Sequence, residues 1–236
     1  MRDLPLATAR LILPDIMLYL VGFRRAIRHI LFFVVLVLPV YGCDSEDGTR
    51  ARTTGTVDAA PGPVHALGSA DAPVTIVDYS SLTCSHCAMF HIEVLPLLKK
   101  KYIDTGKVRF IYRNFPLDNV AHKAAMLAGC ASEEKYFPLL DMLFARQRQW
   151  AASSDPRTEL MNLGKMAGID AKSFAACMQN TALGDTILEE RIYGEKEYEI
   201  RSTPTLIIQG EKHVGAASLE ALDEILAPLL KAAEGN

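Results

Sequence analysis

The sequence predicts an α/β fold in which a mixed central sheet is flanked by helices and carries an inserted all-helical domain. Three observations support this prediction. Two strand patterns enclose a helical pattern between residues 72 and 116, residues 119–199 show no strand pattern, and two strand patterns and a helix follow. The stretch of helices is too long for a simple crossover between strands, but it is long enough to be an inserted domain.

The first half of the sheet is predicted from a βαβ pattern. Residues 72–81, "APVTIVDYSS", are rich in β-branched and aromatic residues and indicate a buried strand. Residues 84–102 indicate a helix, which Pro96 should kink. Residues 107–116, "KVRFIYRNFP", indicate a second strand that ends at its proline.

The middle of the chain is predicted to be helical from residue 119 to about residue 199. Asp155 followed by Pro156 is typical of a capping residue and a proline in the first helical turn. Asp170 should cap the next helix, and residues 185–200 indicate a longer one.

The end of the chain returns to strands. Residues 203–209 and 212–216 are separated by Gly210 and Glu211, which favour a tight hairpin. Ser218 should cap a final helix whose apolar residues follow the helical period. The two halves are therefore expected to share one sheet.

Length and charge restrict the possible functions. The chain has 236 residues, half of them hydrophobic, which suits one substantial domain or one domain with an insertion. Residues 1–42 contain five arginines and two acidic residues and therefore carry a net charge of +3. Because the whole chain has a net charge of −3, the remainder carries −6. An acidic body with no basic run argues against nucleic acid as a partner.

The N-terminus is expected to be a targeting segment. Arginines at 24, 25 and 28 precede the apolar run 30–40, which is too short to span a bilayer as a helix but fits a signal peptide. The run leads to Gly42 and Cys43, which resemble the lipobox of bacterial lipoproteins. Lipidation of Cys43, ordinary cleavage nearby and an uncleaved anchor remain open, and all three place the body outside the cytoplasmic membrane.

These boundaries divide the chain into four parts. We expect a signal segment over residues 1–43 and a flexible, polar linker over 44–63. The sheet-containing domain should comprise 64–118 and 200–236, and the inserted helical domain should comprise 119–199.

The motif Cys84-Ser85-His86-Cys87 is the main candidate for chemistry. A structural zinc site needs four ligands that converge. Besides the motif itself and the nearby His91, the sequence has no second CxxC and no paired-histidine motif that could supply ligands. A purely structural disulfide in so short a loop would add little stability. Metal binding and a structural staple are therefore the weaker interpretations, and no metal or cofactor is expected.

A redox role for the motif has a direct physical basis. The start of a helix presents unpaired N–H groups and a positive dipole end, which stabilise a thiolate at Cys84. A protonated His86 would add positive charge. A stabilised thiolate makes the disulfide form a better oxidant. Cys87, one turn further along the helix, should be more buried and act as the resolving thiol.

From about residue 65 to residue 230 the chain resembles the DsbA family of thiol:disulfide oxidoreductases within the thioredoxin-like superfamily. The resemblance rests on "VTIVDYSSLTCSHC", "RNFPL", "FPLLDMLFARQRQW" and "STPTLIIQG". It implies a thioredoxin fold with a helical insertion. Ser85 stands where the best-known oxidase has proline, whereas the histidine is retained.

The resemblance also assigns roles to residues outside the motif. It implies that Pro204 is a cis-proline facing the CxxC and that Thr203 presents backbone polar groups to a substrate peptide. Asp78 lies six residues before Cys84, where thioredoxin-like proteins often bury an acid. Such a carboxylate could accept the proton of Cys87, although a surface or capping role is the alternative.

The two remaining cysteines lie in the helical part of the chain. In an oxidising compartment Cys130 and Cys177 are expected to form a second disulfide, as some DsbA-like proteins do, and two isolated buried thiols are the alternative. The five cysteines would then supply one lipid anchor, one redox pair and one structural bridge.

The leading functional hypothesis is a monomeric oxidase of the bacterial cell envelope or periplasm. It would exchange disulfides with cysteine-containing exported proteins, and the resemblance implies reoxidation by a membrane partner of the DsbB type. The first alternative is a reductase or isomerase that works in the reverse direction. The second is a non-enzymatic lipoprotein that binds a partner or a metal.

Overall fold

The computed structural model describes residues 59–235, and in this part of the chain five strands form one sheet in the order β1-β3-β2-β4-β5. The strands are β1 (His65–Leu67), β2 (Val74–Ser80), β3 (Val108–Asn114), β4 (Thr205–Ile208) and β5 (Glu211–Val214). Strands β2 and β3 are parallel, whereas the other neighbours are antiparallel. The predicted mixed sheet is therefore confirmed.

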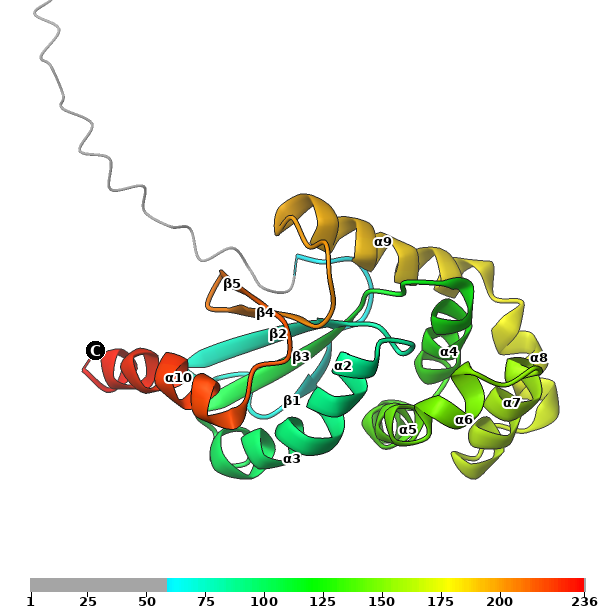
Figure 1. Ribbon diagram of the computed structural model, residues 1–236, viewed down its shortest axis with the longest axis horizontal. Coiled ribbons are helices and arrows are strands. Elements are labelled where there is room, and N and C mark those ends of the chain that lie inside the picture. The colour runs from blue at the N-terminus through cyan, green and yellow to red at the C-terminus, as the bar shows by residue number, and fades with distance from the viewer. Residues whose placement is uncertain (1–58, 236) are drawn as a thin grey trace, which may run out of the picture. The chain divides into compact units, whose positions relative to one another are not determined.

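One face of the sheet is covered by two long helical segments (Figure 1). The first runs from residue 85 to 103 through α2 (Ser85–Met89), η1 (Phe90–Val94), α3 (Leu95–Leu98) and η2 (Lys99–Ile103), in which η1 and η2 are π-helical turns. Pro96 is the second residue of α3, which continues directly from the π-helical turn η1. The second segment is α10 (Leu219–Glu234), which Ser218 caps as predicted.

Alternation along β2 decides which side chains meet these helices. Ile76 belongs to the large core beneath α2 and α10, whereas Val77 and Tyr79 belong to a smaller core on the opposite face. Because successive side chains of a strand point to opposite faces, Asp78 shares the face of Ile76. The sheet thus directs the carboxyl group of Asp78 toward the helix that carries the CxxC motif.

The helical insertion connects β3 to β4. Its helices are α4 (Asn119–Gly129), α5 (Glu133–Ala145), α6 (Gln147–Ala151), α7 (Pro156–Met166), α8 (Ala171–Met178) and α9 (Thr181–Glu197). The side chains of Asp155 and Asp170 accept hydrogen bonds from Thr158 N and Ser173 N, which confirms both predicted caps. Figure 1 shows α9 passing over the sheet face opposite α2 and α3.

A buried ion pair attaches α9 to the sheet. Arg113 of β3 donates through Nη1 to Glu190 Oε1 at 2.9 Å, and both side chains are almost fully buried. The same guanidinium donates to the carbonyl oxygens of Pro61 and Pro63. Residues 61–63, the last part of the expected linker, therefore pack against the domain.

Three local features differ from the sequence-based expectations. Strand β1 was not predicted, because three residues are too few to show a period. The hairpin loop consists of Gln209 and Gly210, both at positive φ as a type I′ turn requires, so it lies one residue earlier than expected. Helix α9 ends at Glu197, and Glu199 has a positive φ of 51°, so the last helical turn predicted up to residue 200 does not form.

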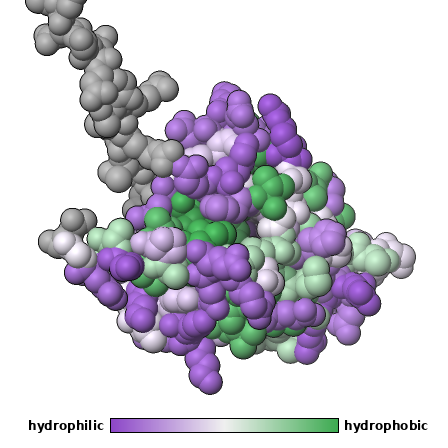
Figure 2. Space-filling model, turned by 60° about the vertical axis from the view of Figure 1, so that its left-hand side comes forward, coloured by the Kyte–Doolittle hydropathy of each residue, from purple (hydrophilic) through white to green (hydrophobic). Residues whose placement is uncertain are grey.

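The surface of the described region is mixed in character. Figure 2 shows one face, on which hydrophilic side chains predominate and hydrophobic ones gather near the middle. Within residues 59–235, no helix combines the length and the apolar character that crossing a bilayer requires. The predicted signal segment and Cys43 lie outside the described residues.

Candidate active site

Cys84 occupies the N-cap of α2, where its backbone is extended and its side chain meets the first free N–H groups of the helix. The Cys87 N–H donates to Cys84 Sγ at 3.4 Å. The preceding loop is held by Gln147 of α6, whose Nε2 donates to the carbonyl oxygens of Leu82 (2.8 Å) and Cys84 (2.9 Å). These contacts leave the Cys84 sulfur accessible at the start of the helix.

The surroundings of Cys84 favour its thiolate. Its pKa is lowered from 9.0 to about 5, first by a hydrogen bond from the Cys87 thiol, and then by the Thr203 side chain and the N–H groups of Cys87 and His86. Partial burial of the sulfur acts in the opposite direction and is outweighed. Cys84 therefore has the electrostatic character of a nucleophile at neutral pH.

Cys87 has the opposite character. Its side chain is fully buried, and burial is the main reason why its pKa is raised far above the ordinary value. The hydrogen bond to Cys84 and the negative charge of Asp78 raise it further. Both cysteines are free thiols in this structure. The pair thus consists of an accessible sulfur whose thiolate is favoured and a buried sulfur whose neutral thiol is favoured.

Thr203 and Pro204 lie directly beside Cys84. The peptide bond between them is cis. The Cys84 thiol is 3.3 Å from the Thr203 carbonyl oxygen, to which only the neutral thiol can donate. The Thr203 hydroxyl is buried and has no hydrogen-bond partner in this structure, and the Thr203 side chain is one of the groups that lower the pKa of Cys84. Both groups belong to a residue 119 positions away in the sequence.

Ser85 and His86 are exposed at the first turn of α2. The contribution of His86 to the low pKa of Cys84 comes through its backbone N–H. The sequence had suggested the imidazole charge as the source, so the role of that side chain stays a prediction.

Asp78 is fully buried behind the cysteine pair and is hydrogen-bonded. Its Oδ1 accepts from Ser80 Oγ at 2.6 Å, and its Oδ2 lies 2.8 Å from His91 Nε2. The His91 ring stacks on Phe144 with centroids 4.1 Å apart. The alternative of a surface aspartate does not hold, whereas the role as proton acceptor for Cys87 stays a prediction.

His91 and Gln147 are site residues whose roles the sequence did not indicate. His91 had been considered only as a metal ligand, although its position four residues after Cys87 places it on the same helix face, which is a readable signal. Gln147 lies 63 residues from the cysteine whose carbonyl oxygen it contacts, and no local pattern marks it. Among residues 59–235, no group of three or more His, Cys, Asp or Glu side chains is arranged to hold a metal ion.

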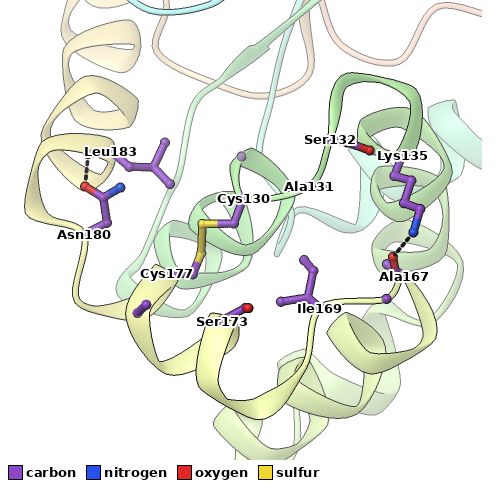
Figure 3. A pocket seen from close by; sticks show the side chains of 13 residues that line it. Cys130, Ala131, Ser132, Lys135, Ala167, Ile169, Ser173, Cys177, Asn180 and Leu183 are labelled. Atoms are coloured by element: carbon purple, nitrogen blue, oxygen red, sulfur yellow. Dashed lines mark hydrogen bonds between the residues drawn. A yellow bond between two sulfur atoms is a disulfide. The ribbon is translucent and has the colours of Figure 1, made fainter.

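Cys130 and Cys177 are joined by a disulfide with an S–S distance of 2.03 Å (Figure 3). It links the end of α4 to α8 and borders an open pocket that Lys135, Ile169 and Leu183 also line. The bridge lies within the helical insertion, away from the CxxC motif. The alternative of two isolated thiols therefore does not describe this structure.

Comparison with known proteins places these features in a family. A family model described as thioredoxin matches residues 60–227. The crystal structure of alpha-DsbA1 from Wolbachia pipientis is 31% identical with a TM-score of 0.68, and the match covers 75% of this chain and 96% of that one. A protein-disulfide isomerase from Novosphingobium aromaticivorans is 25% identical with a TM-score of 0.63, over 72% of this chain and 98% of that one.

Curated relatives give a similar result over a shorter region. A Rickettsia conorii protein that carries the provisional name of a protein-disulfide oxidoreductase is 32% identical over 145 residues. The match covers 61% of this chain and 52% of the relative, so the chain spans about half the length of the curated relatives it matches. The solved structures confirm the predicted thioredoxin fold with a helical insertion.

Proposed function

Because this chain belongs to the DsbA family of thioredoxin-like proteins, we propose that it is a thiol:disulfide oxidoreductase that acts on cysteine-containing proteins through Cys84 and Cys87. The observation that carries the proposal is the contrast between the two sulfurs. Cys84 is accessible and has a pKa of about 5, whereas Cys87 is buried and has a raised pKa.

The proposed reaction begins with the 84–87 disulfide. A substrate thiolate attacks Cys84 Sγ, the bond to Cys87 breaks, and Cys87 takes up a proton as it leaves. A second substrate thiolate then attacks the substrate sulfur of the mixed disulfide and releases the Cys84 thiolate. The substrate loses two electrons and gains a disulfide, while the protein pair gains those electrons. One of the two substrate thiol protons is bound at Cys87 and the other passes to solvent.

The oxidising direction is favoured by the ionisation of Cys84. A thiolate that is stable in the reduced form makes reduction of the disulfide more favourable, and the protein is then a stronger oxidant. Reoxidation requires an external acceptor, which we propose to be a quinone-linked membrane protein of the DsbB type. In this scheme Asp78 accepts the Cys87 proton when Cys87, rather than a second substrate thiolate, attacks Cys84 in the mixed disulfide.

The cell envelope is the proposed location, with exported proteins as substrates and the monomer as the active form. The apolar run before Cys43 supports export and attachment at the N-terminus. The Cys130–Cys177 disulfide also supports an oxidising compartment.

Equilibration of the 84–87 pair with glutathione tests the direction of the reaction. An oxidase should have a potential near that of a strong oxidant, about −120 mV, whereas a reductase should lie near about −270 mV. A Cys87→Ala variant should accumulate mixed disulfides through Cys84. A pair that is strongly reducing would support the reductase alternative, and a Cys84 that forms no mixed disulfide would refute the assignment.

A further inference from the structure

A groove lies beside the CxxC motif, between α2 and η1 on one side and the end of α5 with α6 on the other. It begins at Ser85 and His86, the two residues between the cysteines. Figure 1 shows α5 beside α2. The groove is on the α6 side of Cys84, whereas Thr203 contacts the sulfur from the β4 side.

The helix wall of the groove is partly apolar. Met89 and Ile92 line it, with 42% and 48% of their surfaces exposed. They are three residues apart, so they lie on one helix face. Single exposed apolar residues are ordinary on a protein surface. Two neighbours in a groove that starts at the active site instead offer a contact for an apolar side chain of a bound polypeptide.

The opposite wall is positively charged. Arg146 and Arg148 line the groove and are exposed. Within the described region, the Arg146 guanidinium donates to the Met166 sulfur at 3.6 Å, and a thioether sulfur is a weak acceptor. Neither arginine is paired with a carboxylate of residues 59–235, although the whole chain has a net charge of −3. Glu93 lies on the helix wall, where it would repel an acidic ligand toward the arginines.

The segment that carries the two arginines is hydrogen-bonded to the loop that carries Cys84. Gln147 stands between the two arginines in sequence, and its side chain bonds the carbonyl oxygens of Leu82 and Cys84. Helix α6 is therefore held against the loop that carries the nucleophile. A polypeptide that is covalently bound to Cys84 would reach this wall by passing over Ser85 and His86, within a few residues of its own cysteine.

We propose that this groove binds the segment of a substrate polypeptide that adjoins its reactive cysteine, and that it favours segments with an acidic residue beside an apolar one. The inference rests on the proposed function and specifies its substrate class. The occupant follows from charge complementarity with two unpaired arginines and from the apolar contact at Met89 and Ile92.

A set of peptides tests this selectivity. In the first set, each peptide has one cysteine and, on one side of it, a leucine followed by two glutamates, two glutamines or two lysines. In the second set, the same residues lie on the other side of the cysteine. The rate constant for reaction with the oxidised wild-type protein is measured. In the set whose variable residues reach the groove, the glutamate peptide should react fastest and the lysine peptide slowest. Exposed charge pairs contribute up to about 1 kcal/mol, which is about fivefold between the glutamate and glutamine peptides.

Salt and a matched pair of variants identify the source of the preference. Raising salt from about 0.02 M to about 0.5 M should largely remove it, because exposed charges are screened. Arg148→Glu should reverse the order of the peptides. Lys172→Glu on the exposed surface of α8 makes the same change in net charge and should leave the order intact. Thermal unfolding of both variants should show that they are folded.

Several results would overturn the inference. These are equal rates for the three peptides on both sides of the cysteine, an unchanged order in Arg148→Glu, or equal changes in the two variants. A dimer that Arg148→Glu abolishes would assign the groove to a second copy of the chain and would also overturn it. Failure of the wild-type protein to react with any peptide would refute the proposed function, and with it the inference. Reaction without charge preference would refute the groove alone.

Discussion

Replacing Thr203 with valine should raise the pKa of Cys84. Valine has nearly the same shape as threonine but lacks the hydroxyl, which is buried and has no hydrogen-bond partner in this structure. The Thr203 side chain is one of the groups that hold the pKa of Cys84 near 5. The backbone carbonyl that accepts from the neutral thiol is retained in the variant, so the substitution removes only the hydroxyl and its effect on the thiolate.

The size of the effect follows from the strength of a hydrogen bond to a charged group, about 1.5–3 kcal/mol when it is shielded from solvent. Because the Cys84 sulfur is partly exposed, screening reduces this to roughly 1.4 kcal/mol, or about one pH unit. The pKa of Cys84 should therefore rise to about 6. Both values lie below pH 7, so the whole difference acts on the reduced form at that pH. The potential should fall by about 30 mV, toward a weaker oxidant.

The ultraviolet absorbance of the thiolate as a function of pH measures the pKa, and equilibration with glutathione measures the potential. Thr203→Ser keeps the hydroxyl and is the matched control, which should retain the low pKa. The reasoning would be refuted by a Thr203→Val protein with the wild-type pKa, since the hydroxyl would then contribute nothing. It would also be refuted if serine and valine raised the pKa equally.

Four further predictions follow from the geometry of the site and of the insertion. Reduced protein should gain stability relative to oxidised protein from the low pKa of Cys84; the gain is complete above pH 9 and lost as pH falls through about 5, and denaturant titrations with no such pH dependence would contradict it. His86→Ala should raise the pKa of Cys84 if the imidazole is charged, whereas an unchanged potential would show that the helix N–H groups act alone. Replacing both Cys130 and Cys177 with alanine should lower the free energy of unfolding by up to about 4 kcal/mol and leave the exchange rate at Cys84 unchanged, so a slower exchange would argue against a structural role. Asp78→Asn should slow the attack of Cys87 on the mixed disulfide by about 100-fold in stopped-flow measurements, and a wild-type rate in a folded variant would exclude Asp78 as the proton acceptor.

Local patterns made most of the fold predictable from the sequence. The runs that become β2 and β3 are rich in β-branched and aromatic residues, and they are almost entirely buried because helices cover both faces of the sheet. The caps at Asp155, Asp170 and Ser218 were readable because a capping side chain bonds to N–H groups only two or three residues away. Strand β1 lacked such a signal.

The site was predictable only in part, because much of it depends on tertiary contacts. The two cysteines and their different environments follow from the start of one helix, which is local. The position of Thr203 against Cys84 came from resemblance, since no short-range pattern brings together residues 119 apart. The pairing of Asp78 with His91 requires the register between β2 and the helix above it, which a single sequence does not specify.

The hydrogen bonds of Gln147 have a consequence for how such a protein can diversify. They end on backbone carbonyl oxygens, so they do not depend on the side chains of the residues they hold. If the proposed groove selects polypeptides, substitutions at Arg146 or Arg148 would change that selection while Gln147 still maintains the geometry of the loop that carries Cys84. Helix α6 would then hold two adjacent kinds of position, one that can vary with the substrate and one that keeps the reactive loop in place.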